Sequence, residues 1–129
     1  MKTISILSAI IILATSHANA QDFKRNLRNF EPRAKTATMK VYGECCRCER
    51  RIEKALKKDG IKSASWNVDT KILTVQYILT ADITGVGKIQ KLVAGAGHDT
   101  EIYKANDSVY NSLPECCQYQ RPENFSSDK

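Results

Sequence analysis

Apolar residues alternate with polar ones in three stretches of the chain, and this period of two predicts strands. The first stretch spans residues 37–42, the second residues 64–68 and the third residues 73–77. A short polar turn at residues 69–71 separates the last two stretches, so we predict that they form a hairpin. The alternating apolar residues are Ala37, Met39, Val41, Ala64, Trp66, Val68, Leu73, Val75 and Tyr77.

Between the first and second predicted strands, apolar residues recur three and four positions apart. Ile52, Ala55 and Leu56 follow this spacing, and charged residues fill the positions around them. Gly60 follows where a helix C-cap is expected. The pattern therefore predicts an amphipathic helix from about Cys46 to Asp59.

The remaining pattern predicts a second helix and a last strand. An apolar stripe at helical spacing covers residues 83–96, with Asp82 as a candidate N-cap, and residues 100–104 form a short final strand. The order strand, helix, strand, strand, helix, strand is that of an α+β, ferredoxin-like sandwich. Such a fold has one four-stranded antiparallel sheet with two helices on one face. From Ala105 onward the chain is polar and shows no clear period.

The first twenty residues are typical of a cleaved signal peptide. Lys2 precedes an apolar run over residues 4–14, and residues 18–20 read Ala-Asn-Ala, a small-x-small pattern that signal peptidases cut. The run is shorter than the roughly 20 apolar residues of a membrane-spanning helix. We therefore predict a periplasmic or secreted protein without stable membrane insertion, in which residues 21–35 are a polar leader.

Removal of this peptide leaves 19 basic and 14 acidic residues, a net charge of +5. Export argues against a nucleic-acid partner, and the aromatic residues are not interleaved with the basic ones as stacking on nucleic acid requires. Six basic residues on the first predicted helix either attract an acidic partner protein or form an ordinary solvated face. These residues are Arg47, Arg50, Arg51, Lys54, Lys57 and Lys58.

The five cysteines fall into two clusters. Cys45, Cys46 and Cys48 lie within four positions, and Cys116 and Cys117 are neighbours. Disulfides are the usual expectation for an exported protein, and an odd number leaves at least one thiol without a partner in the chain. Such close spacing cannot link distant segments evenly, whereas it suits chelation of a metal.

Cys45 and Cys48 form a CxxC motif directly before the first predicted helix. The helix N-terminus and nearby arginines favour thiolate, which is the form that binds metal. Two thiolates suit a soft ion: copper(I) first, then mercury(II) or silver(I), or zinc if further ligands are added. The alternatives are a local disulfide and a small thiol-disulfide oxidoreductase that uses the same pair. Nothing else in the sequence indicates an enzyme.

From Thr36 to Lys104 the sequence also resembles heavy-metal-associated domains, the family of copper chaperones, copper-ATPase N-terminal modules and periplasmic mercury-binding proteins. The resemblance includes the CxxC motif, Ile52 four residues after Cys48, and the stretches Trp66-Asn67-Val68-Asp69 and Ala94-Gly95-Ala96-Gly97. It implies a ferredoxin-like fold and transfer of soft metal ions by thiolate exchange. The partner would be another carrier or a metal-transporting ATPase. Residues 105–129 lie beyond it as a cysteine-containing tail.

The sequence departs from the family pattern before the CxxC motif and within it. Members usually carry a buried methionine in this loop, whereas only Glu44 separates Gly43 from Cys45, so the loop is one residue shorter. Cys46 is an additional cysteine. It is either a third soft ligand or a thiol that faces away from the ion.

Three further residues are candidate metal ligands. His98 follows the second helix, at a position that the family uses to tune its site, and is either a ligand or an exposed loop histidine. Cys116 and Cys117 either supply auxiliary thiolates, form a disulfide with Cys46 or with another chain, or stay free. If the last strand runs away from the metal, the tail must return across the domain, which its length permits.

Overall fold

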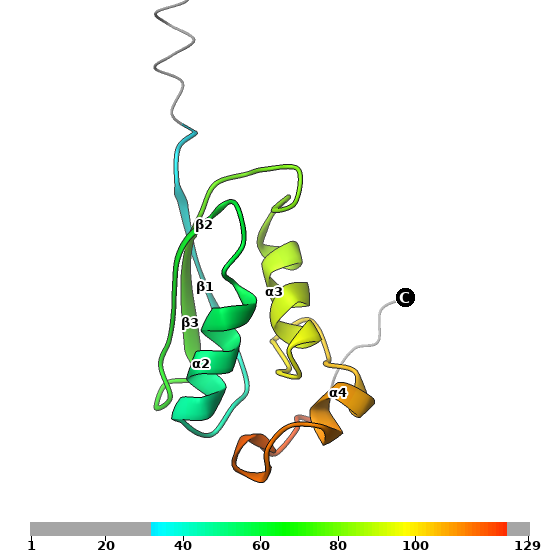
Figure 1. Ribbon diagram of the computed structural model, residues 1–129. Coiled ribbons are helices and arrows are strands. Elements are labelled where there is room, and N and C mark those ends of the chain that lie inside the picture. Colours follow the sequence, from blue (N-terminus) through cyan, green and yellow to red (C-terminus); the bar gives the residue numbers. More distant parts are fainter. Residues whose placement is uncertain (1–31, 124–129) are drawn as a thin grey trace, which may run out of the picture. The chain divides into compact units, whose positions relative to one another are not determined.

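The computed structural model describes residues 32–123, which belong to one compact unit of the chain. The predicted signal peptide and most of the polar leader lie outside these residues. The described part contains β1 (Lys35–Lys40), α2 (Cys46–Ala55), β2 (Ile61–Trp66), β3 (Ile72–Tyr77), α3 (Val86–Gly95), α4 (Asp107–Asn111) and a short 3-10 helix, η1 (Glu115–Cys117) (Figure 1). None of these helices is long and apolar enough to cross a bilayer.

The sheet has the strand order β1-β3-β2, and both pairings are antiparallel. The predicted hairpin is confirmed: β2 pairs with β3, with Trp66 opposite Leu73. Both α2 and α3 cover the same face of the sheet (Figure 1). The alternation of the strands directs their apolar side chains to this face, so the predicted α+β class is confirmed.

The core lies between the sheet and the two helices. Burial of each large apolar side chain here contributes about 1.5–3 kcal/mol. The strand periods place one set of side chains in this layer, and the helical stripes supply the other. Its fully buried members include Met39, Val41, Ile52, Leu56, Trp66, Leu73, Val75, Ile83, Ile89 and Val93.

The predicted last strand, residues 100–104, does not form. Thr100 makes a single antiparallel bridge with Val41, at the edge of the sheet where a fourth strand was expected. The Thr100 hydroxyl then accepts the N–H groups of Ile102 and Tyr103, at 3.3 and 2.9 Å. These local bonds close a turn and remove both donors from a strand ladder. Among the described residues the sheet therefore has three strands rather than four.

Both helices are shorter than predicted. α2 ends at Ala55 with Leu56 as its C-cap, so Gly60 is not the C-cap that the sequence predicted. Gly60 has a φ of +91° and lies in the turn that leads to β2. α3 begins at Val86, so Asp82 is not its N-cap. A turn causes this difference, because the N–H of Ile83 donates to the Thr80 hydroxyl at 2.9 Å and holds this stretch outside the helix.

The chain from Ala105 to Glu123, here named the C-terminal segment, is folded although its sequence shows no clear period. Asn106 caps α4 by accepting the N–H of Ser108 at 2.9 Å. Leu113 lies against Gly97, whose φ is +98°, and a Cβ at Gly97 would lie 2.9 Å from the Leu113 side chain. Four residues of the segment are buried: Ala105, Leu113, Cys117 and Tyr119.

Polar contacts fasten the C-terminal segment to the loop after α3. Arg121 forms a two-pronged ion pair with the buried Asp99, with N–O distances of 2.8 and 2.6 Å. The Tyr119 hydroxyl accepts the Asp99 N–H at 2.6 Å and donates to the Gly97 carbonyl at 3.0 Å. Arg121 also donates to Asp107 at 2.7 Å and lies over the Tyr110 ring. The segment therefore stays at the end of the sheet where α2 begins.

Candidate metal centre

The CxxC loop passes close over the core between β1 and α2. A Cβ at Gly43 would lie 3.0 Å from both the Cys48 Cβ and the Trp66 ring, so glycine permits this close approach. The Trp66 indole N–H donates to the Val41 carbonyl at 3.1 Å, which holds the ring under the loop. Cys45 is the N-cap of α2, and Cys48 lies in the first turn of the helix.

The two thiols of the motif converge. The sulfurs of Cys45 and Cys48 are 3.7 Å apart, and all five cysteines are free thiols. Cys48 is fully buried and accepts the N–H of Glu44 at 3.4 Å, whereas Cys45 is half-buried. One sulfur of the pair is therefore open to an incoming ion, and the other is anchored behind it.

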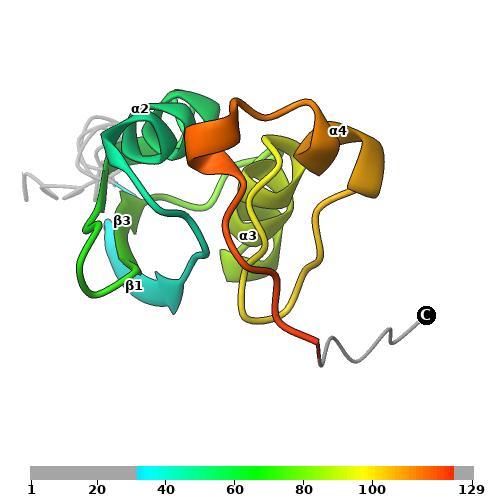
Figure 2. The same ribbon diagram turned by 90° about the horizontal axis from the view of Figure 1, so that it is seen from below.

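The C-terminal segment brings two more thiols to this pair. The sulfurs of Cys45 and Cys117 are 3.8 Å apart, and those of Cys45, Cys116 and Cys117 all lie within 4.8 Å of one another. η1 carries these residues and contacts α2, as the view along the helices shows (Figure 2). Cys117 is buried and Cys116 is exposed.

The surroundings of the thiols favour one thiolate near neutral pH. Partial burial alone would raise the pKa of Cys45, but it is outweighed by the backbone N–H groups of Cys48 and Arg47 and by the neighbouring thiols. Together these contacts lower the pKa of Cys45 from 9.0 to about 7. Burial, followed by the nearby Cys48 and Cys45, raises the pKa of Cys117 well above its usual range.

Cys46 and His98 are placed differently from these thiols. Cys46 is exposed and is not in the group of converging sulfurs. His98 is fully buried, so its interpretation as an exposed loop histidine is wrong. Its Nδ1 donates to the Tyr42 carbonyl at 2.9 Å, and its ring stacks on Tyr119. Its Nε2 has no hydrogen-bond partner among the described residues, and its role as a ligand stays a prediction.

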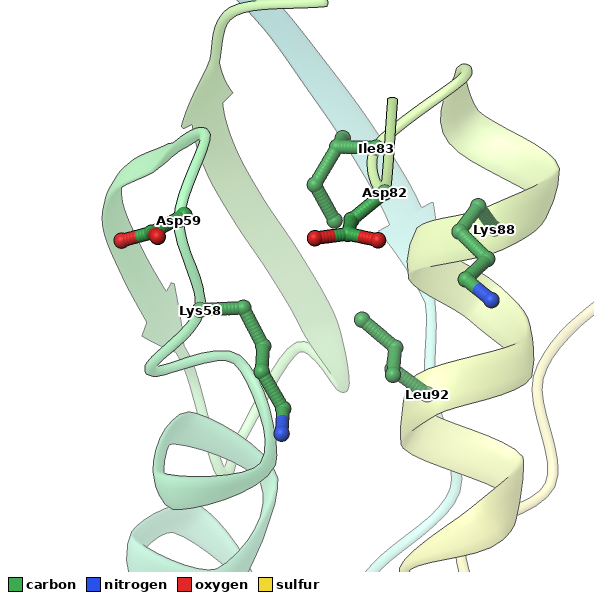
Figure 3. Close-up of a pocket in the computed structure, with 6 residues that line it drawn as sticks. All are labelled: Lys58, Asp59, Asp82, Ile83, Lys88 and Leu92. Atoms are coloured by element: carbon green, nitrogen blue, oxygen red, sulfur yellow. The ribbon is translucent and has the colours of Figure 1, made fainter. Parts of the chain in front are cut away.

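Two other surface features lie outside the cysteine cluster. A pocket at the far ends of α2 and α3 is lined by Lys58, Asp59, Asp82, Ile83, Lys88 and Leu92, and none of these is a soft ligand (Figure 3). The six basic residues predicted on the first helix are all exposed. Within residues 32–123 none of the six forms a salt bridge, so their charges are available to a partner.

Three residues that position Cys116 and Cys117 were not predicted from the sequence. These are Asp99, Tyr119 and Arg121, which carry no metal ligand themselves but fasten the segment that does. A usable signal was the spacing of Tyr110 and Leu113, because apolar residues three apart indicate a helical turn with one packed side.

Residues 44–99 match the Heavy-metal-associated domain family, a family of metal-binding modules. The match begins directly before the CxxC motif and ends at Asp99, the residue that Arg121 binds. The C-terminal segment with its two cysteines therefore lies outside the matched part.

Several solved structures are similar to part of the chain. The CopZ metallochaperone is 26% identical, over 51% of this chain and 98% of its own, with a TM-score of 0.46. Oxidized MerP from Ralstonia metallidurans CH34 is 27% identical over 53% and 94%, with a TM-score of 0.46. The Cu(I)-loaded N-terminal domain of a potential copper-translocating P-type ATPase from Bacillus subtilis is 26% identical over 60% and 96%, with a TM-score of 0.47. No curated protein sequence matches the chain.

Proposed function

We propose that this protein is an exported carrier of copper(I), a chaperone or scavenger that holds the ion through Cys45 and Cys48. The observation that carries the proposal is the convergence of these sulfurs to 3.7 Å at the start of α2. Around Cys45, the group of converging ligand atoms among the described residues consists of the sulfurs of Cys45, Cys116 and Cys117, without a carboxylate or imidazole. An all-thiolate set selects soft ions over hard ones. Mercury(II), silver(I) and zinc are the competing cargoes.

Delivery proceeds by exchange of thiolates. A first thiolate of the partner binds the ion while the half-buried Cys45 and the buried Cys48 still hold it, and one original bond breaks. A second thiolate of the partner then binds, and the other original bond breaks. Because Cys45 has a pKa of about 7, it can bind and release the ion near neutral pH without a strong base. The ion therefore never has to enter water as a free species.

The partner in this proposal presents an acidic surface around its own CxxC pair. The exposed basic face of α2 begins next to the thiols and attracts such a surface. One similar structure is a domain of a potential copper-translocating ATPase, which supports a metal-transporting ATPase as this partner. A steep loss of transfer rate with added salt would support the electrostatic contact, because screening weakens it.

One observation favours a second function, that of a small thiol-disulfide oxidoreductase. The lowered pKa of Cys45 is also what an attacking thiolate needs, and Cys48 is placed to complete the exchange. The two functions differ in what the reduced protein does. A carrier takes up copper(I) and does not reduce protein disulfides, whereas an oxidoreductase reduces insulin.

The test is a copper(I) titration of the reduced protein against a chromogenic chelator in the absence of oxygen. We expect tight binding of one ion and at least tenfold weaker binding by Cys45→Ser, about 1.4 kcal/mol. Cys46→Ser is the matched control, because its exposed thiol lies outside the cluster. Equal affinity of the native protein and Cys45→Ser, or insulin reduction by the native protein, would contradict the proposal. The N-terminal residue of the protein recovered after expression in a bacterium tests export.

A further inference from the structure

We propose that the C-terminal segment adds a second ligand set to the metal centre, in which Cys45, Cys116 and Cys117 together hold a three-coordinate thiophilic ion. The inference rests on the proposed function, because Cys45 is shared with the CxxC pair. An ion can then pass between Cys48 and the tail thiols without leaving Cys45. The tail set retains the ion, and the CxxC pair delivers it.

The distances between the sulfur atoms support three-coordinate binding. With metal–sulfur bonds of about 2.3 Å, two thiolates on opposite sides of an ion lie about 4.6 Å apart, and three around it lie about 4.0 Å apart. The distances from Cys45 are 3.7 Å to Cys48 and 3.8 Å to Cys117, both shorter than the linear arrangement needs. The sulfurs of Cys45, Cys116 and Cys117 all lie within 4.8 Å of one another, so small movements produce a trigonal set.

The folding of the C-terminal segment holds its two thiols in place. Cys117 is fully buried, and its N–H donates to the Pro114 carbonyl at 2.7 Å, which fixes η1. Two residues further on, Tyr119 is buried and bonded to Asp99 and Gly97. The tail thiols are therefore held near Cys45 before an ion arrives. Such preorganisation lowers the entropic cost of binding.

The charge around Cys45 suits a complex of three thiolates. Three thiolates give a copper(I) complex a net charge of −2, and a trivalent arsenic complex none. The N-terminus of α2 and Arg47 lie beside Cys45 and offset negative charge at the site. The site can therefore hold either the copper(I) complex or the uncharged arsenic complex.

Arsenite is the sharpest probe, because it needs three thiols and no redox change. Arsenous acid and three thiols give the arsenic trithiolate and three waters: three As–S bonds form, three As–O bonds break, and each thiol proton leaves with a hydroxide. We would titrate arsenite into the intact protein in a phosphine reductant and measure binding by mass spectrometry. Alkylation and peptide mapping of the complex then identify the protected thiols.

We expect one arsenic per chain, with Cys45, Cys116 and Cys117 protected and Cys46 alkylated. Cys116→Ser and Cys117→Ser should each bind at least tenfold more weakly. Cys46→Ser, whose thiol is exposed and lies outside the cluster, should stay within about threefold of the native protein. Loss of binding in Cys48→Ser with retention in Cys116→Ser would overturn the assignment, as would the absence of saturable binding.

A second measurement does not depend on how the variants fold. X-ray absorption of the copper(I)-loaded native protein should give three sulfur neighbours, and two would contradict the inference. The proposed function is tested separately by copper(I) affinity of the Cys116→Ser, Cys117→Ser double variant, which keeps the CxxC pair. If this variant binds copper(I) tightly and the native protein shows two sulfurs, the carrier function stands and the tail site does not.

Discussion

The core, which includes the part that matches the heavy-metal-associated domain, and the C-terminal segment fold for different reasons. In the core, buried side chains follow the strand and helix periods, and each element supplies several of them. In the segment, α4 has five residues and buries none of them, and such a short helix is not stable by itself. The segment is instead held by a few anchors, chiefly Leu113, Tyr119 and Arg121.

The metal centre joins these two regions. Cys45 and Cys48 belong to the core, and Cys116 and Cys117 belong to the segment. A function that needs only the CxxC pair should survive release of the segment, whereas one that needs the tail thiols should not. Each region has its own reporter: Trp66 is the single tryptophan and is buried in the core, and Cys117 is a buried thiol of the segment.

The largest expected effect is that of Arg121→Ala. Asp99 is fully buried, so removal of its partner leaves an unpaired buried charge, a change that costs about 3–5 kcal/mol. We expect release of the segment, measured as alkylation of Cys117 at least a hundredfold faster, with unchanged Trp66 emission. Lys104→Ala is the control, because the Lys104–Asp107 pair is exposed to solvent and such a pair contributes little to stability. Slow alkylation in Arg121→Ala would show that the ion pair does not hold the segment.

A smaller effect is expected for Gly97→Ala. Gly97 has a φ of +98°, and the new Cβ would lie 2.9 Å from Leu113, so we expect a loss of about 1–3 kcal/mol in urea unfolding. Gly95→Ala is a control of opposite sign. Gly95 ends α3 with nothing near its missing Cβ, so alanine there should stabilise by up to about 1 kcal/mol through helix propensity. Equal stability of the two variants would exclude this role for Gly97.

The smallest expected effect is a pH dependence of the free energy of unfolding, which His98 causes. This residue lies where the two regions meet. Burial lowers the pKa of His98 below 6.5; Arg51 acts in the same direction, whereas the Tyr42 carbonyl and Asp99 act against it. In the pH range below 6.5 the unfolded chain then binds more protons, so stability falls as pH falls, by at most about 1.4 kcal/mol per pH unit. We expect His98→Gln to reduce this slope in urea unfolding between about pH 5 and 7.5. The same slope in both proteins would remove His98 as its source.

The sequence predicted the core because its residues follow periods that depend only on local geometry. The alternation through Leu73, Val75 and Tyr77 indicated β3, and the spacing of Ile52 and Leu56 indicated α2. The boundaries were less predictable, because a single side chain can redirect the backbone. The Thr100 hydroxyl did so by closing a turn where a fourth strand was expected.

For the metal centre, the sequence by itself determined the CxxC pair, since two cysteines three positions apart at a helix start must lie close together. It left Cys46, Cys116 and Cys117 as alternatives. Only the tertiary structure brought Cys117 to 3.8 Å from Cys45 and left Cys46 exposed. The reason is that the approach depends on pairs distant in the chain, above all Asp99 with Arg121 and Gly97 with Leu113. No local period encodes which distant residues meet, so a segment held by such pairs cannot be placed from its own sequence.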